Sequence, residues 1–367
     1  MQSPRQKLVI EPGEGVKAAW SEERRKLIAQ LNAMIAPDMK APKSVIIMLE
    51  AKGMDAYHVS HYPDGHEIHV PYQFELKGAK KHPIHSAAIL AHEYGHGILA
   101  ENLNLNDRFK SALALLVKPG RALKRGDRFA DYLKWDSLRN EATQIVQKAQ
   151  TLSDARTARA AVTTDPNDAE LAATDAELKK LEARLKEIET EMDSLKVDGD
   201  EVFEMLGAFH EFFADVVAVV FYNDPKVIWR GLYSPKLEYV GMSPQEEREM
   251  FKSFTLRRFD KNVRIRDFSE EEIHVALTPV RTYAWDHYLN NPLYRAHKSK
   301  ILKTVFDSIV DEVIERGKTP NITPSPAVQN QRLIDRLDAN FAKLKESLAL
   351  PTNQSRPKSK SRAENVH

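Results

Sequence analysis

The sequence predicts a predominantly helical α+β protein with a small mixed sheet and a long helical-hairpin insertion. Two long stretches, 86–100 and 201–222, are apolar over several helical turns. Short runs within 44–72 have the length and the turn signals of strands. The stretch 137–197 carries apolar residues at alternating spacings of three and four, which is typical of a coiled coil.

The amino-acid composition argues against several kinds of binding site and several classes of protein. The 54 basic and 53 acidic residues nearly cancel, so no net charge favours nucleic acid or a membrane surface. The absence of cysteine excludes disulfides and thiolate ligands. No apolar run is long enough for a transmembrane segment. The compartment stays open: cytoplasmic if Met1 is the native start, and extracytoplasmic or secreted if a signal peptide was removed.

The first 43 residues are expected to form an N-terminal helix, with an apolar side across 16–36. The run Ser44–Glu50 has the length of a buried strand. A Pro-Asp-Gly turn at 63–65 separates two more strands and predicts a hairpin. We expect Glu67–Tyr72 to be the edge strand, because Pro71 fits only at an edge or at a strand end.

The next segment, 86–100, is expected to be a buried helix containing the sequence His-Glu-Tyr-Gly-His at 92–96. Two histidines four residues apart lie on one face of a helix and can bind a single metal ion. Glu93 is then placed to take a proton from a metal-bound water. A metal would also satisfy three polar groups whose burial is otherwise costly. The alternative is a helix whose histidines bond to backbone carbonyls. Gly95 is expected to allow close approach of a neighbouring element.

A catalytic zinc site needs three protein ligands and one open position. The apolar helix predicted at 201–222 offers Glu204, Glu211 and Asp215 as a single polar stripe. Glu211 is the expected third ligand. Asp215, one turn later, is expected to accept the free ring N–H of a ligand histidine. Glu204 and His210 remain alternative ligands.

These residues resemble the gluzincin group of zinc metallopeptidases, whose pattern is HExxH followed by a helical ExxxD. His92, Glu93, His96, Glu211 and Asp215 match it one by one. The match covers two helices and the strands before the first. Two departures are His210, where asparagine commonly precedes the glutamate, and the long gap between the motifs.

The resemblance implies a zincin-like catalytic core, a zinc ion, and hydrolysis of a peptide or protein substrate with Glu93 as general base. It further implies that the substrate pairs with the edge strand. A side chain from the second subdomain should stabilise the oxyanion. The first candidates are His274 and Arg281, ahead of Tyr283 and His287.

The 137–197 hairpin is expected to pair within one chain, with Asp165 and Pro166 starting its second arm. It could gate the substrate or dock a protein partner. An alternative function is therefore a zinc-binding, inactive peptidase-like scaffold that uses this hairpin for protein interactions. A weaker one is a helical adaptor without metal. A second metal site among the histidines at 58–85 is a further alternative.

The expected organisation has six parts. They are the N-terminal helix at 1–43, a subdomain with the HExxH helix at 44–104, the helical insertion at 105–200, the third-ligand helix with the rest of the catalytic subdomain at 201–300, closing helices at 301–350, and a disordered tail at 351–367.

Overall fold

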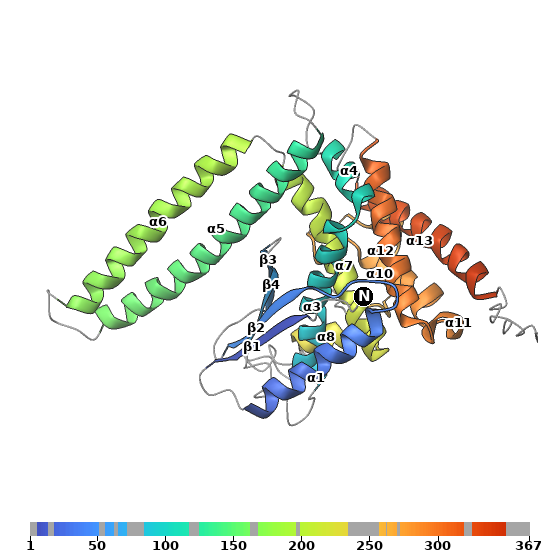
Figure 1. Ribbon diagram of the computed structural model, residues 1–367, viewed down its shortest axis with the longest axis horizontal. Helices are drawn as coiled ribbons and strands as arrows, with labels where there is room; N and C mark the ends of the chain where they lie inside the picture. Colours follow the sequence, from blue (N-terminus) through green and yellow to red (C-terminus); the bar gives the residue numbers. More distant parts are fainter. Residues whose placement is uncertain are drawn as a thin grey trace, which may run out of the picture.

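The computed structural model describes residues 6–13, 18–50, 56–61, 65–71, 84–116, 125–161, 168–195, 199–233, 257–261, 263–269, 272–318 and 325–349. Over these ranges the chain is predominantly helical with one small mixed sheet, as predicted. Figure 1 shows a helical body beside the sheet, with a long hairpin of two helices extending away from it. The expected tail at 351–367 lies outside the described residues.

The sheet has four strands in the order β1-β2-β4-β3. They are β1 (Lys7–Pro12), β2 (Ser44–Glu50), β3 (Tyr57–His61) and β4 (Gly65–Pro71). Neighbours β1, β2 and β4 are parallel, whereas β3 runs antiparallel to β4 at the edge.

This topology corrects two predictions. A strand, β1, precedes the N-terminal helix and was missed because its apolar run is only Leu8–Ile10. The predicted edge strand at Glu67–Tyr72 is wrong, because β4 is paired on both sides and the edges are β1 and β3. Pro71 is tolerated there since it is the last residue of β4, where the missing N–H interrupts no further pairing.

Two buried helices form the centre of the body, α3 (Ile84–Asn104) and α7 (Gly199–Tyr222). Helix α3 packs against α7 and also contacts β3, β4 and α1 (Ala18–Ile35). The close α3–α7 contact depends on Gly95, since a Cβ there would lie 2.8 Å from the Cα of Ala214. The expectation that Gly95 permits close approach is therefore confirmed.

The hairpin consists of α5 (Arg125–Ala160) and α6 (Ala169–Leu195), which pair within the chain as predicted. Its own apolar core contains Leu138, Ile145, Leu181 and Ile188. Ion pairs join the arms, including Arg184 Nε to Glu141 Oε1 at 2.8 Å and Lys148 Nζ to Glu177 Oε1 at 2.7 Å.

Asp165 and Pro166, the predicted start of the second arm, lie outside the described residues. Where α6 is described, Asp168 caps it: its Oδ1 accepts from the backbone N–H of Glu170 at 2.9 Å and of Leu171 at 3.1 Å.

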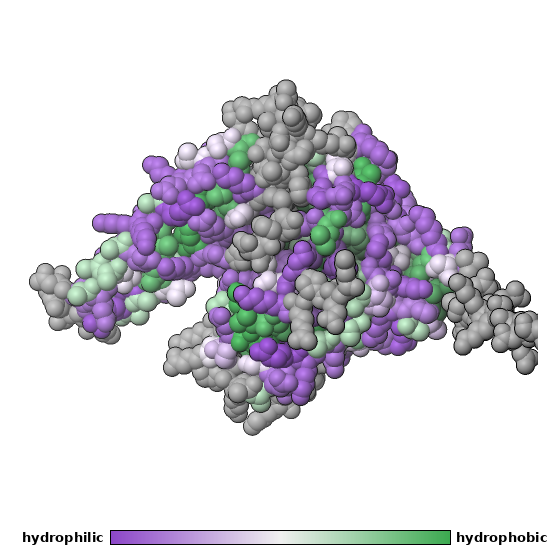
Figure 2. Space-filling model, in the orientation of Figure 1, coloured by the Kyte–Doolittle hydropathy of each residue, from purple (hydrophilic) through white to green (hydrophobic). Residues whose placement is uncertain are grey.

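The remaining helices complete the body. They are α4 (Asp107–Leu116), α8 (Val227–Tyr233), the 3-10 turn η2 (Ile265–Asp267), α10 (Thr278–Ala284), the π-helical turn η3 (Trp285–Leu289), α11 (Pro292–Arg295), α12 (Lys298–Arg316) and α13 (Pro326–Ala349). Helix α12 packs against α13, α4 and α7. Among the residues that Figure 2 colours, hydrophilic ones cover most of this face, with smaller hydrophobic patches between them. None of the helices in the described ranges is both long and apolar enough to cross a bilayer.

Candidate metal centre

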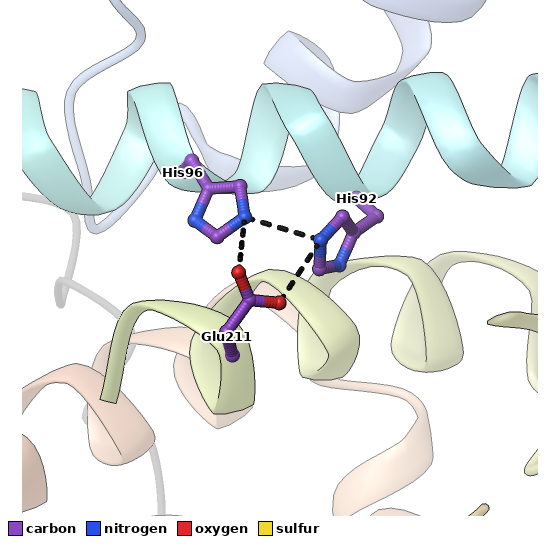
Figure 3. Close-up of side chains that lie close together, drawn as sticks. All are labelled: His92, His96 and Glu211. Carbon is purple, nitrogen blue, oxygen red and sulfur yellow. Dashed lines mark hydrogen bonds and ion pairs between the residues drawn. The ribbon is translucent and has the colours of Figure 1, made fainter. Parts of the chain in front are cut away.

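Three side chains from two helices that lie far apart in the sequence meet between α3 and α7. His92 and His96 project from one face of α3, and Glu211 projects toward them from α7 (Figure 3). The three offer ligand atoms that all lie within 4.8 Å of one another. Nε2 of His92 is 3.1 Å from Nε2 of His96, and each of these nitrogens is 3.5 Å from an oxygen of Glu211. The predicted ligand set is thus brought together.

The spacing of these atoms fits a small metal ion. Ligands at about 2.0–2.1 Å in a tetrahedral arrangement are about 3.3 Å apart. The three residues are almost entirely buried, with 2%, 8% and 9% of the surface of His92, His96 and Glu211 exposed. Burial is the main reason that the pKa of His96 lies well below its usual value, and the nearby positive charges act in the same direction, against Glu211. The ring of His96 is therefore neutral, as a metal ligand must be. The pocket can hold a metal ion.

Glu211 is ionised despite its burial. Burial alone would favour the protonated acid, but Arg257, His96 and His92 outweigh it and hold the pKa of Glu211 well below its usual value. An anionic carboxylate between two imidazoles is a suitable donor set for a divalent cation.

Asp215 lies one turn beyond Glu211 on α7 and has no exposed surface. Its Oδ1 is 3.0 Å from Nδ1 of His92, within reach of the ring N–H on the side away from Glu211. With Nδ1 held by Asp215, Nε2 faces the other two ligands. Burial and Arg257 lower the pKa of His92, but the contacts with Asp215 and Glu211 outweigh them and raise it to about 9, so a metal ion must displace a proton from this ring. Burial opposes the charge on Asp215, but Arg257 and Arg281 outweigh it and lower the pKa of Asp215.

Glu93 is buried beside the two histidines, with Oε1 4.0 Å from Nε2 of His92. Burial is the main reason that the pKa of Glu93 is raised to about 7, and nearby Glu211 and Asp215 act in the same direction, against His92 and Arg257. A carboxyl group with this pKa can both accept and return a proton near neutral pH.

The two expected oxyanion-stabilising residues occupy different places. His274 lies at the centre: its Nε2 is 3.5 Å from Oε1 of Glu211, and its side chain is 42% exposed. Its Nδ1 bonds to the carboxylate of Glu272, which fixes the ring orientation. Arg281 has no exposed surface and bonds to Asp215 Oδ2 through Nε at 2.8 Å. Its position corrects the expectation, because it is fully buried against Asp215.

Arg257 is the residue that the sequence reasoning missed. Its Nη2 contacts Glu211 Oε2 and lies 2.8 Å from His92 Nε2, while its Nε is 3.2 Å from Asp215 Oδ1. It comes from a short described stretch, 257–261, that has no helical or strand periodicity. The one signal in the sequence was indirect. Glu211 and Asp215 are acidic residues on a buried helix face, and buried carboxylates need a cationic partner.

The alternative ligands are not supported equally. The ring of His210 stacks on that of His96 with centroids 6.0 Å apart, and His210 is not in the metal-binding group. The side chain of Glu204 lies outside the described residues. His58 and His66 bond to each other at 3.0 Å, but no second group of three ligands occurs among the side chains that the structure describes. Those of His61, His82 and His85 are outside that set.

Comparison with protein-family models, with curated proteins and with solved structures gives no match for this chain.

Proposed function

We propose that this protein is a zinc-dependent metallopeptidase with a zincin-like core that resembles the gluzincin group. The observation that carries the proposal is the convergence of His92, His96 and Glu211 on one buried point. The HExxH sequence supplies the histidine pair, and the acidic residue one turn after Glu211 supports one of its rings. Three protein ligands leave a position for water, which distinguishes a catalytic zinc site from a closed structural one.

The zinc ion, when bound, would polarise the scissile carbonyl and acidify a water molecule. Glu93 would remove a proton from that water and return it to the departing amine, a role that its raised pKa supports. His274 would donate a hydrogen bond to the developing oxyanion from the exposed side of the centre, with Glu272 holding its ring. Arg281 would act as a positioning residue through Asp215.

The substrate would be a peptide in an extended conformation. The edge strand β3 contacts α3, the helix of the HExxH motif, and its outer side is the place where a further strand could pair. Helix α5 also contacts β3, so the hairpin borders this strand. The hairpin would then limit which substrates reach the centre.

Chelator-sensitive cleavage of a peptide library tests the proposal. We expect cleavage by the zinc-loaded protein, loss of cleavage on chelation, and recovery when zinc is returned. The variant Glu93→Gln should keep the zinc and lose turnover, because the amide cannot act as a base. Zinc binding without any cleavage by the wild type would favour the inactive scaffold, and cleavage that survives in Glu93→Gln would refute the role of Glu93.

A further inference from the structure

The guanidinium of Arg257 contacts the atoms that a metal ion would use. Its Nη2 lies 2.8 Å from Nε2 of His92, and because guanidinium N–H groups can only donate, a hydrogen bond there uses the lone pair of Nε2. The same Nη2 contacts Oε2 of Glu211. These are two of the three donors of the metal centre, and a lone pair directed at an N–H is not available to a metal ion.

The charges around Arg257 also indicate that its guanidinium and a metal ion exclude each other. Glu211 and Asp215 are buried carboxylates, and Arg257 is 6% exposed between them. Its positive charge therefore balances the anions that a divalent cation would otherwise balance. A metal ion and this guanidinium cannot occupy neighbouring positions in so small a buried volume without strong repulsion.

The backbone of Arg257 is fixed close to the centre. Its φ of 54° lies in the left-handed region, which is uncommon for a residue other than glycine. The following residues are attached to the body: the N–H of Phe259 donates to the carbonyl of Pro225 at 3.0 Å, and Asp260 Oδ2 pairs with Lys226 Nζ at 3.3 Å. The backbone therefore holds the side chain of Arg257 within reach of the ligands.

We propose that Arg257 is an internal cation that competes with the metal ion for His92 and Glu211, so that metal uptake exchanges one cation for the other. The proposal rests on the metal centre proposed above. Arg257 keeps the ligands together and their charges balanced before the metal arrives. Molecules in which the guanidinium occupies the ligands cannot bind metal. The apparent metal affinity is therefore the intrinsic affinity multiplied by the fraction of molecules in which the ligands are free.

Zinc dissociation constants of the purified, zinc-depleted full chain test this exchange. They are measured by competition with a chromogenic chelator for wild type, Arg257→Ala and Arg257→Gln. If the guanidinium holds the ligands in about nine of ten molecules, its removal tightens zinc binding about tenfold. Two variants are used because the loss of a buried cation destabilises the metal-free protein, and glutamine retains part of the side-chain volume. Circular dichroism checks that each variant is folded.

The matched control is Arg281→Gln, which removes a guanidinium from Asp215 but leaves His92 and Glu211 in contact with Arg257. Tighter zinc binding in the Arg257 variants and not in this control supports the exchange. Equal gains in zinc affinity in all three variants overturn the exchange, because the loss of any nearby positive charge would then have the same effect. Unchanged or weaker binding in the Arg257 variants overturns it while the metal centre stands. If no form, wild type included, binds zinc, both the exchange and the metal centre fail.

Discussion

Replacing Asp215 by asparagine should weaken zinc binding and destabilise the protein together. The carboxylate contacts Nδ1 of His92 at 3.0 Å, Nε of Arg281 at 2.8 Å and Nε of Arg257 at 3.2 Å. Asparagine keeps the shape and removes the charge. Zinc affinity should fall about 10–100-fold, because the ring of His92 loses the acceptor that orients it. That loss corresponds to about 1.4–2.8 kcal/mol of binding free energy.

The cost in stability comes from the arginines. Arg281 has no exposed surface and Arg257 has 6%, so neither can reach water when its anion is removed. Breaking a buried ion pair by removing one partner costs about 3–5 kcal/mol. The matched control is Asp311→Asn, whose partner Arg108 is 68% exposed. A surface pair of this kind contributes at most about 1 kcal/mol.

The assays are a zinc competition titration and urea unfolding of the zinc-depleted protein. We expect Asp215→Asn to lose much zinc affinity and much stability, and Asp311→Asn to lose only a little stability. The role of Asp215 is refuted if Asp215→Asn binds zinc as tightly as wild type and unfolds at the same urea concentration as the control.

Four other predictions follow from the site. Glu93→Gln should retain zinc by elemental analysis while kcat falls about 10²–10⁴-fold; a variant of undiminished kcat contradicts the assignment. Turnover should rise with pH through about 7 as Glu93 loses its proton, because burial raises its pKa to about 7; a flat pH–rate profile argues against it. His274→Ala should lower kcat about 10²–10³-fold with zinc content unchanged, and a loss of zinc instead would make His274 a ligand. Gly95→Ala should cost about 1–3 kcal/mol in urea unfolding, since its Cβ would lie 2.8 Å from Ala214 Cα; wild-type stability would show that the helices separate freely.

Acidification provides a test with a defined sign. The pKa of Asp215 is lowered in the folded protein from the ordinary value of 3.8. Its stabilising effect is therefore fully present above that ordinary value and is lost as the pH falls toward the folded one. The unfolding free energy of wild type should decrease in this acid range more steeply than that of Asp215→Asn. Parallel curves for the two proteins would contradict the ion-pair account.

The ligand set could be predicted because its signals are local. The i, i+4 spacing of His92 and His96 fixes their shared face, and the stripe of Glu211 and Asp215 on an apolar helix requires a cationic partner. The hairpin was predictable for the same reason, since the apolar seam that includes Leu181 and Ile188 is a repeat within one segment.

What could not be predicted depends on contacts between distant segments. Sheet order is one example: β4 and β3 are both short, and nothing in either strand says which one has a second neighbour. Arg257 is another, because its contact with Glu211 joins residues from separate elements and no periodicity marks it. The position of Arg281 could not be predicted for the same reason, since its burial against Asp215 is a tertiary property.

Zinc content per chain, measured by elemental analysis, tests the metal centre most directly. Wild type and His210→Ala should each carry a single zinc ion per chain, because His210 stacks on His96 and is not one of the three ligands. Glu211→Ala should carry almost none. Zinc retained by Glu211→Ala, or lost from His210→Ala, would contradict the assignment of the third ligand, and a wild type without zinc would contradict the centre itself.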